Sequence, residues 1–287
     1  MRVVREFQPA PFLERVGPYL RRQPAENNLM LGLLGDLARA GVPKNRDAAD
    51  APMSPLFIYV EGPRGDVDAV ALQTPPRALI VSRASEEAIQ ALIDFAISAD
   101  LALSGVVGPT LTAQRFASGW GARTGRAAVL RVEQIVYELE RVRPCAACPG
   151  KLREALTADE NLLAAWSKAF IAETAMDPVE NFLAFVRGKM AARQLFVWEN
   201  DAPVSMTVWM GRTEQGVRIG YVYTPPAERK KGYASAAVAA LSQRLLDEGC
   251  PRCFLFTEVA NPTSNKIYQA IGYDRVCDFQ LYAFPAA

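Results

Sequence analysis

The feature that most constrains this chain is a change of apolar period at residues 229–234, which read RKKGYA. The preceding stretch, VRIGYVYT at 217–224, alternates as a half-buried β-strand does. In the stretch that follows, apolar residues recur at helical spacing and share one face: Ala234, Val238, Leu241 and Leu245. A strand that enters a helix through a short basic loop with a glycine predicts a domain in which a sheet packs against helices.

The rest of the C-terminal half continues this pattern. Two helix starts are marked by TADE, with Thr157 as the cap, and by DPVE, with Asp177 as the cap and Pro178 in the first helical position. Three strand-like runs follow: QLFVWE, PVSMTVWMG and VRIGYVYT. After the helix come the strand CFLFTEV, a short helix after NPTSN, and the closing strand YDRVCDFQLYAF. We therefore expect a mixed α/β fold around a central sheet.

The N-terminal half shows the same order of elements more faintly and contains no literal repeat of the C-terminal half. A helix-rich start to about residue 40 precedes three strand-like runs, PLFIYVE, DVDAVALQT and RALIVS. A helix, a strand, a second helix and a long alternating strand follow. The segment RVRPCAACPGKL has two prolines, a glycine and no apolar period. We predict a domain at 1–143, a linker at 144–151 and a second domain at 152–287.

Composition excludes several classes of function. The chain of 287 residues is 50% hydrophobic, carries a net charge of +1 and has no basic surplus in either half, so we expect no nucleic-acid partner. Its apolar runs fall short of the ~20 residues of a membrane span, and its first residues are too polar for a secretory signal. We therefore expect a cytoplasmic location and no membrane partner. The sequence does not indicate a homo-oligomer, and it does not exclude one.

Histidine is absent, which removes the commonest general base and every histidine-ligated metal site. Cysteines form two CxxC pairs, Cys145 with Cys148 and Cys250 with Cys253. The pairs lie about a hundred residues apart, far beyond the ~15–20 of a zinc ribbon. We expect reduced, structural thiols and no metal, with a zinc site or a redox pair as the alternative.

The basic loop has the chemistry of an anion site. Backbone N–H groups at a helix N-terminus lack partners, and the helix dipole adds partial positive charge there. Gly232 permits a close approach of the backbone or an unusual φ, and Arg229, Lys230 and Lys231 can add charge-assisted contacts. The site suits a pyrophosphate. A solvated surface loop is the alternative.

Two blocks of the sequence resemble the GNAT superfamily of acyl-CoA-dependent N-acyltransferases. The family hallmark, Arg/Gln-x-x-Gly-x-Gly/Ala between the fourth strand and the third helix, is matched by Arg229, Gly232 and Ala234. A second block, TEVANPTSNKIYQAIGY at 257–273, is similar to the family's strand, asparagine, short helix and tyrosine. The resemblance covers about residues 152–284 and implies the GNAT fold there. With the repeated element order it predicts two tandem GNAT-like domains, of which the N-terminal one is degenerate and lacks a coenzyme loop.

The resemblance also implies which residues hold acetyl-CoA, the expected co-substrate. The pantetheine arm would pair, as an added strand does, with the backbone of Val222, Tyr223 and Thr224. Asn261 and Asn265 would bond the pantetheine or adenosine side. Main-chain amides would hold the pyrophosphate at seven successive residues: Arg229, Lys230, Lys231, Gly232, Tyr233, Ala234 and Ser235. The loop departs from the family at the two lysines, where glycine and a variable residue are frequent, and we expect phosphate affinity to persist because the backbone sites remain.

Two side chains are candidates for the chemistry. Tyr268 would lie beside the thioester sulfur as general acid, since a phenol with a pKa near ~10 can donate to a departing thiolate; its alternative is a core tyrosine. Glu258 can deprotonate the incoming ammonium directly or through water, or can be a solvated carboxylate at a strand end. Glu173 can bind a cationic acceptor, although a structural role is favoured. Of Tyr221 and Tyr223, one is expected to face the acceptor and the other the core.

These expectations combine into a predicted function. We expect an N-acetyltransferase that moves an acetyl group from acetyl-CoA to a primary amine of a small molecule or peptide by direct attack in a ternary complex. The alternatives are a coenzyme A-binding sensor without turnover, a tRNA-dependent aminoacyltransferase of tandem GNAT architecture, and an interaction module. The balanced charge and the intact loop argue against the tRNA-dependent reaction. The sequence carries no signature of the acceptor.

Overall fold

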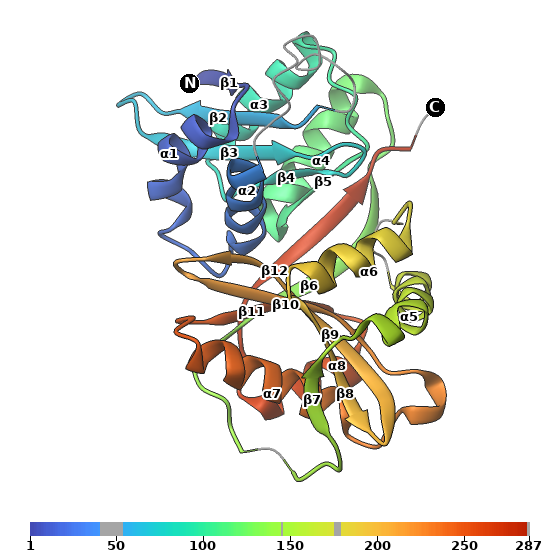
Figure 1. The fold of residues 1–287 in the computed structure, drawn as a ribbon. Coiled ribbons are helices and arrows are strands. Elements are labelled where there is room, and N and C mark those ends of the chain that lie inside the picture. Colours follow the sequence, from blue (N-terminus) through green and yellow to red (C-terminus); the bar gives the residue numbers. More distant parts are fainter. Residues whose placement is uncertain (41–53, 145, 175–178, 286–287) are drawn as a thin grey trace. The chain divides into compact units, whose positions relative to one another are not determined.

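The computed structural model describes residues 1–40, 54–144, 146–174 and 179–285. Contacts divide the chain into two compact units, Met1–Val136 with Val276–Ala287, and Tyr137–Arg275 (Figure 1). We call these unit 1 and unit 2. The last strand of the chain therefore counts with unit 1, whereas the sequence analysis assigned it to the second domain. Whether the predicted domains 1–143 and 152–287 fold alone is a separate question, and their boundaries stay a prediction.

Unit 1 is a mixed sheet with helices. Its elements follow the chain as β1 (Arg2–Glu6), α1 (Pro9–Leu20), α2 (Asn28–Ala40), β2 (Leu56–Glu61), β3 (Val67–Gln73), β4 (Leu79–Val81), α3 (Glu86–Ser98), β5 (Gly105–Pro109), α4 (Thr110–Thr124) and β6 (Val129–Leu139). Strands β1 to β4 form an antiparallel meander, and β4 pairs in parallel with β5. The final strand of the chain then pairs antiparallel with β5 over Phe279–Ala283.

Unit 2 repeats the same order of elements. They are β7 (Lys151–Glu154), α5 (Glu160–Ala172), α6 (Phe182–Ala191), β8 (Leu195–Asn200), β9 (Ala202–Thr213), β10 (Gly216–Tyr223), α7 (Tyr233–Asp247), β11 (Cys253–Glu258) and α8 (Pro262–Ile271). The order is completed in the chain by β12 (Asp274–Ala283), which counts with unit 1 from Val276 on. Strands β7 to β10 are antiparallel, and β10 pairs in parallel with β11. The mixed α/β fold and its duplicated order are confirmed. The sequence analysis missed β1 and β7, which are short and carry no apolar alternation.

Helices α5 and α6 begin at Glu160 and Phe182, whereas the sequence analysis expected helix starts near residues 157 and 178. Thr157 is not a cap, because a 3₁₀ turn at Thr157–Asp159 precedes α5 and the carboxylate of Asp159 accepts from Leu156 N–H at 2.8 Å. Asp177 and Pro178 lie outside the described residues. Helix α6 is capped by Asn181, whose side chain accepts from Ala184 N–H at 2.9 Å.

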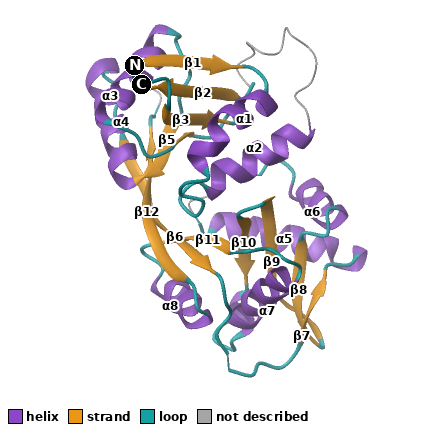
Figure 2. Cartoon of the chain, turned by 90° about the vertical axis from the view of Figure 1, so that its left-hand side faces the viewer, coloured by secondary structure: helices purple, strands orange, loops and turns teal. Residues whose placement is uncertain are grey.

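Two apolar layers hold the central strands of unit 2. Residues on α5 and α6 pack against one face, in a cluster that includes Leu163, Trp166, Met206, Tyr221 and Tyr223. On the other face, Tyr233 and Ala237 of α7 pack against Trp198 and Val204. Figure 2 shows both helix layers of this unit with the strands between them. The small residues along α7 let the helix lie close to the sheet and fix its N-terminus beside the end of β10. None of the helices in the described part of the chain has the length and apolarity needed to span a bilayer.

Candidate functional site

Strand β10 leaves its regular ladder near its end. Its pairing with β9 shifts between Gly220 and Tyr223, so that Tyr221 and Val222 together stand opposite a single residue, Thr207. Tyr221 adopts a left-handed φ of 50°, as residues in bulges do. On the other side, β10 pairs with β11 only at Val217–Cys253 and Arg218–Phe254 within the described residues. The ladder between the two strands ends at these pairs in the described part of the chain, so β10 and β11 part toward the C-terminal end of β10.

The loop after β10 ends at the N-terminus of α7. Gly232 is the cap residue, with a left-handed φ of 86° and no side chain to satisfy the first N–H groups. The first helical bond runs from Ala236 N–H to Gly232 C=O at 3.0 Å. The N–H groups of Tyr233, Ala234 and Ser235 therefore have no acceptor within the helix, and they point out of its positive end. This is the geometry of an anion site, and a Cβ at Gly232 would force that residue into strain.

The three cations of the loop differ in their surroundings. Arg229 donates from Nε to Thr224 C=O at 2.9 Å and from one terminal nitrogen to Glu173 at 2.7 and 2.9 Å. Lys231 pairs with Glu228 at 2.9 Å, which raises the pKa of the lysine. Lys230, at a left-handed φ of 65°, has no carboxylate partner among the residues that the structure describes. Of the three side chains expected to contact phosphate, only that of Lys230 forms no ion pair with a carboxylate among the described residues.

Val222, Tyr223 and Thr224 lie where β10 enters the loop. The buried hydroxyl of Ser205 donates to Tyr223 C=O at 3.0 Å and lies 2.9 Å from the Thr224 hydroxyl. Among the backbone groups expected to pair with a pantetheine arm, the carbonyls of Tyr223 and Thr224 therefore already accept one bond each, from Ser205 and from Arg229. Val222 is half-buried in the bulge, at the position where the sequence analysis expected an added strand to pair. Sequence reasoning missed Ser205, although a serine within the apolar alternation of β9 signals a buried hydroxyl.

The two tyrosines of β10 face the same way. The ring centroid of Tyr221 lies 5.1 Å from that of Phe170 and 4.7 Å from that of Phe185, and Tyr223 lies 6.2 Å from Trp166. Both belong to one buried cluster. The expectation that one faces an acceptor and the other the core is wrong, because both rings pack against side chains of α5 and α6 in this cluster.

Tyr268 is on α8, 7% exposed, among other aromatic rings. Its ring centroid lies 6.0 Å from that of Tyr273 and 6.5 Å from that of Tyr137. Burial raises the pKa of Tyr268 to about 12, and a hydrogen bond with the Ser264 hydroxyl opposes part of that rise. The phenol is thus protonated at neutral pH. Its surroundings fit both a core tyrosine and a proton donor.

Glu258, Asn261 and Asn265 converge at the junction of β11 and α8. Asn261 caps α8, accepting from Ser264 N–H at 3.0 Å. Asn265 donates from Nδ2 to Glu258 C=O at 3.1 Å and to Asn261 C=O at 2.9 Å. Its Oδ1 is buried and has no partner among the described residues. The half-buried carboxylate of Glu258 ends β11 on the side where that strand is no longer paired with β10.

The two CxxC pairs are represented in the described residues by Cys148, Cys250 and Cys253. Cys148 lies at the N-terminus of α7, where its thiol donates to Lys231 C=O at 3.6 Å. Cys250 follows the other end of the same helix and is buried. A helix of this length separates the two by roughly 20 Å. Cys145 lies outside the described residues, and within those that are described no group of three potential ligands could hold a metal ion.

The equivalent position in unit 1 has a different chemistry. After β4, the side chain of Ser85 accepts from Ala88 N–H at 3.2 Å and so caps α3, and Glu86 and Glu87 occupy the first turn. A Cβ on Gly108 of β5 would lie 2.5 Å from Val81 C=O, which shows that β4 and β5 stay close at this end. A capped and acidic helix start repels an anion.

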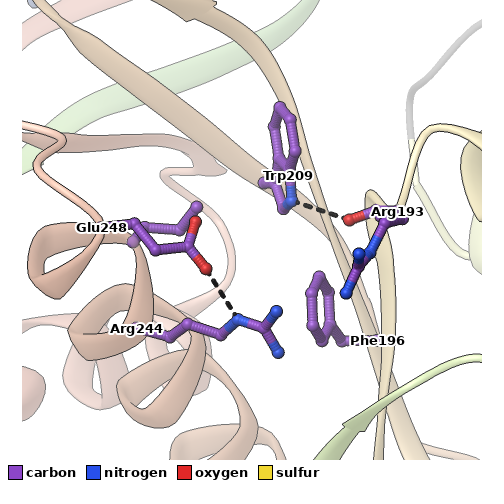
Figure 3. Close-up of a pocket in the computed structure, with 6 residues that line it drawn as sticks. Arg193, Phe196, Trp209, Arg244 and Glu248 are labelled. Carbon is purple, nitrogen blue, oxygen red and sulfur yellow. Dashed lines mark hydrogen bonds and ion pairs between the residues drawn. The ribbon is translucent and has the colours of Figure 1, made fainter.

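A pocket of about 290 Å³ lies at the other end of α7 (Figure 3). Trp209, Phe196, Arg193 and Arg244 line it, together with Glu248. Its charges are already matched, because both guanidinium groups bond Glu154 at 2.9 Å and Arg244 also bonds Glu248 at 2.9 Å. The pocket is therefore distinct from the anion site, and the charged side chains that line it are paired with one another or with Glu154.

Comparison with known proteins points to one family. Residues 158–273 match the sequence model of the acetyltransferase (GNAT) family. No curated protein sequence matches the chain. The family match contains the β10–α7 loop and the β11–α8 junction described above.

Solved structures are similar over nearly the whole chain. A Drosophila protein is 14% identical with a TM-score of 0.65, covering 99% of this chain and 98% of its own. A GCN5-related N-acetyltransferase from Sphaerobacter thermophilus is 16% identical, with a TM-score of 0.60 and coverage of 99% and 97%. A GNAT-family acetyltransferase from Colwellia psychrerythraea is 12% identical, with a TM-score of 0.58 and coverage of 99% and 100%. At these identities the likeness shows the fold, which is consistent with two tandem GNAT-like domains.

Proposed function

We propose that unit 2 transfers an acetyl group from acetyl-CoA to a primary amine, because residues 158–273 match the model of the acetyltransferase (GNAT) family. The observation that carries the proposal is that the β10–β11 ladder ends early while the N-terminus of α7, which has no side-chain cap, follows the same end of β10. An extended arm pairs with a strand edge, and a diphosphate binds such a helix end. One coenzyme contains both groups.

The residues present fit this co-substrate. The amides of Gly232, Tyr233, Ala234 and Ser235 would hold the pyrophosphate, with Lys230 adding charge. The buried Oδ1 of Asn265 lacks a donor among the described residues, which an amide N–H of the pantetheine arm would supply. Val222 offers the backbone for the added strand. Bound there, acetyl-CoA would supply an activated thioester.

Tyr268 is the proposed donor to the departing sulfur. Its pKa of about 12 keeps the phenol protonated, so that it donates a hydrogen bond as negative charge develops on the sulfur. A thiol has a pKa near ~8.5, so a complete proton transfer from Tyr268 would be uphill in the free protein. Stabilisation of the thiolate by the hydrogen bond is therefore the main contribution, and general-acid transfer follows if the bound sulfur becomes more basic.

Glu258 is the proposed acceptor of the ammonium proton. Its position at the end of β11, beyond the last pair of that strand with β10, supports this role, either directly or through one water. The chain has no histidine to take this part, and the reaction needs no covalent enzyme intermediate. Unit 1 is proposed to lack coenzyme binding, since Ser85 and the two glutamates occupy the corresponding helix start.

The test is release of free thiol from acetyl-CoA in the presence of a panel of amines, including small amines, peptides with free N-termini and lysine side chains. The proposal expects amine-dependent release with at least one class. If the protein binds coenzyme A but no amine in the panel leads to release of free thiol, a coenzyme-binding sensor is favoured instead. If the protein does not bind coenzyme A, both the transferase and the sensor are excluded.

A further inference from the structure

We infer that Glu173 is a positioning residue for the loop between β10 and α7, and that Arg229 is its partner in this role and not a phosphate ligand. That this loop binds a coenzyme rests on the proposed function. The contacts that carry the inference, however, are those of the free protein, so they can be tested without the coenzyme.

The guanidinium of Arg229 turns back toward the start of its own loop. Nε donates to Thr224 C=O at 2.9 Å, and one terminal nitrogen lies 2.9 and 2.7 Å from the two carboxylate oxygens of Glu173. The same group lies 5.7 Å from the ring centroid of Tyr223. These contacts set both the direction and the plane of the side chain. Arg229 therefore binds the loop to α5.

The backbone of Glu173 is held in place because this residue is the C-cap of α5, a helix that packs into the core. Its N–H bonds to Ala169 C=O at 3.1 Å as the C-cap of α5. Leu163 and Trp166 of the same helix are buried in the cluster that contains Tyr223. A cation at a helix C-terminus is also favoured by the helix dipole. Glu173, which lies 56 residues before Arg229 in the sequence, thus fixes the position of the loop relative to α5.

Other contacts hold the two ends of the loop. Ser205 fixes Tyr223 and Thr224 from the side of β9, through its bonds of 3.0 and 2.9 Å. Near α7, Lys231 bonds Glu228 at 2.9 Å. Ordering a loop before its ligand arrives reduces the entropy that binding must otherwise supply. The Glu173–Arg229 pair ties the middle of the loop to α5.

The size of the effect follows from the exposure of the pair. The two side chains are 47% and 42% exposed, and exposed pairs contribute little to global stability. Loss of the pair should leave the fold intact. It should weaken coenzyme binding by about fivefold, because roughly 1 kcal/mol of loop ordering would then be supplied on binding.

A double-mutant cycle on the full chain separates positioning from direct binding. Glu173→Gln, Arg229→Gln, the double variant and Lys230→Gln are titrated with coenzyme A by calorimetry, after the wild type. Positioning predicts that each single variant of the pair loses about fivefold and that the double variant loses no more than either. Lys230→Gln is the matched control, a cation in the same loop without a carboxylate partner in the described chain. A second double variant, Glu173→Gln with Lys230→Gln, should show the losses of the two single variants added together.

Amide hydrogen exchange of the free protein gives a second readout. Peptides that cover residues 224–232 should exchange faster in Glu173→Gln and Arg229→Gln than in the wild type, and unchanged in Lys230→Gln. The inference is overturned if Glu173→Gln binds coenzyme A at least as tightly as the wild type while Arg229→Gln loses affinity. It is also overturned if amide exchange at residues 224–232 is the same in both variants as in the wild type. A wild type that does not bind coenzyme A would instead overturn the proposed function, and the exchange data would still decide the positioning role.

Discussion

Tyr268 carries the sharpest expectation for a single residue. Its aromatic surroundings and raised pKa fit a donor that stays protonated throughout the neutral range. The sequence pointed to this tyrosine by its place in the second block, and the structure adds that it is buried. What the sequence could not provide is the partner of Arg229. The pairing with Glu173 joins residues far apart in the chain, and no local pattern encodes it.

Replacing Tyr268 with phenylalanine should lower turnover at least tenfold while the affinity for coenzyme A stays near normal, since only the hydrogen bond to the sulfur is lost. Tyr273→Phe is the matched control, because it removes a buried hydroxyl that bonds Ser242 at 2.9 Å. The control should lose about 1 kcal/mol of stability and little turnover. Equal rates for Tyr268→Phe and the wild type would remove this tyrosine from the mechanism.

The buried phenol also predicts a dependence of stability on pH. The pKa of Tyr268 is about 12 in the folded chain and near 10.0 when exposed, so the folded state holds the proton more tightly. Stability from this group is fully present below pH ~10 and is lost as the pH rises toward ~12. Thermal unfolding between pH 8 and 11.5 should show a steeper alkaline decline for the wild type than for Tyr268→Phe. Parallel curves would contradict the assignment of the raised pKa.

At the scale of elements, the passage from β10 through the loop into α7 was predictable because two apolar periods meet there. The bulge at Tyr221 and Val222 was not, since it depends on the register with β9. Likewise β7, four residues long, is defined by pairing with β8 and not by its own pattern. Local periodicity identifies long elements, whereas ladder geometry is set by residues distant in sequence.

Gly232→Ala tests the left-handed cap of α7. Space is available, as a Cβ would meet only Cys148 Sγ at 3.7 Å, so the cost arises from the φ of 86° and is about 1 kcal/mol. The strain should lower the melting temperature and weaken coenzyme A binding, because the α7 amides shift. Gly188→Ala, inside α6 with nothing within 4 Å, should instead raise stability by roughly 0.5–1 kcal/mol and leave binding unchanged. Wild-type affinity in Gly232→Ala would argue against the amide site.

At the scale of the whole molecule, the repeated element order was visible in the sequence, but the placement of the last strand was not. A strand's own residues do not specify which strands it pairs with. Val276–Ala287 counts with unit 1, where Phe279 is 2% exposed and Phe284 stacks on Trp120 at 5.7 Å.

Phe284→Ala should therefore destabilise unit 1 by about 3–5 kcal/mol, and removal of residues 276–287 by more. Val276→Ala serves as control on the same strand, since this valine is 38% exposed and its loss should cost under ~0.5 kcal/mol. Thermal unfolding and exchange of β5 amides would measure both effects. If the truncated chain kept wild-type protection in β5, the assignment of this strand to unit 1 would be wrong.

The central claim is that main-chain donors at the start of α7 hold the diphosphate of a coenzyme. The most direct measurement is hydrogen exchange of the full chain with and without saturating coenzyme A. The account predicts added protection in peptides that cover residues 229–236 and 258–268, and none in those that cover residues 82–90 of unit 1. Protection confined to residues 82–90, or no change anywhere, would contradict it.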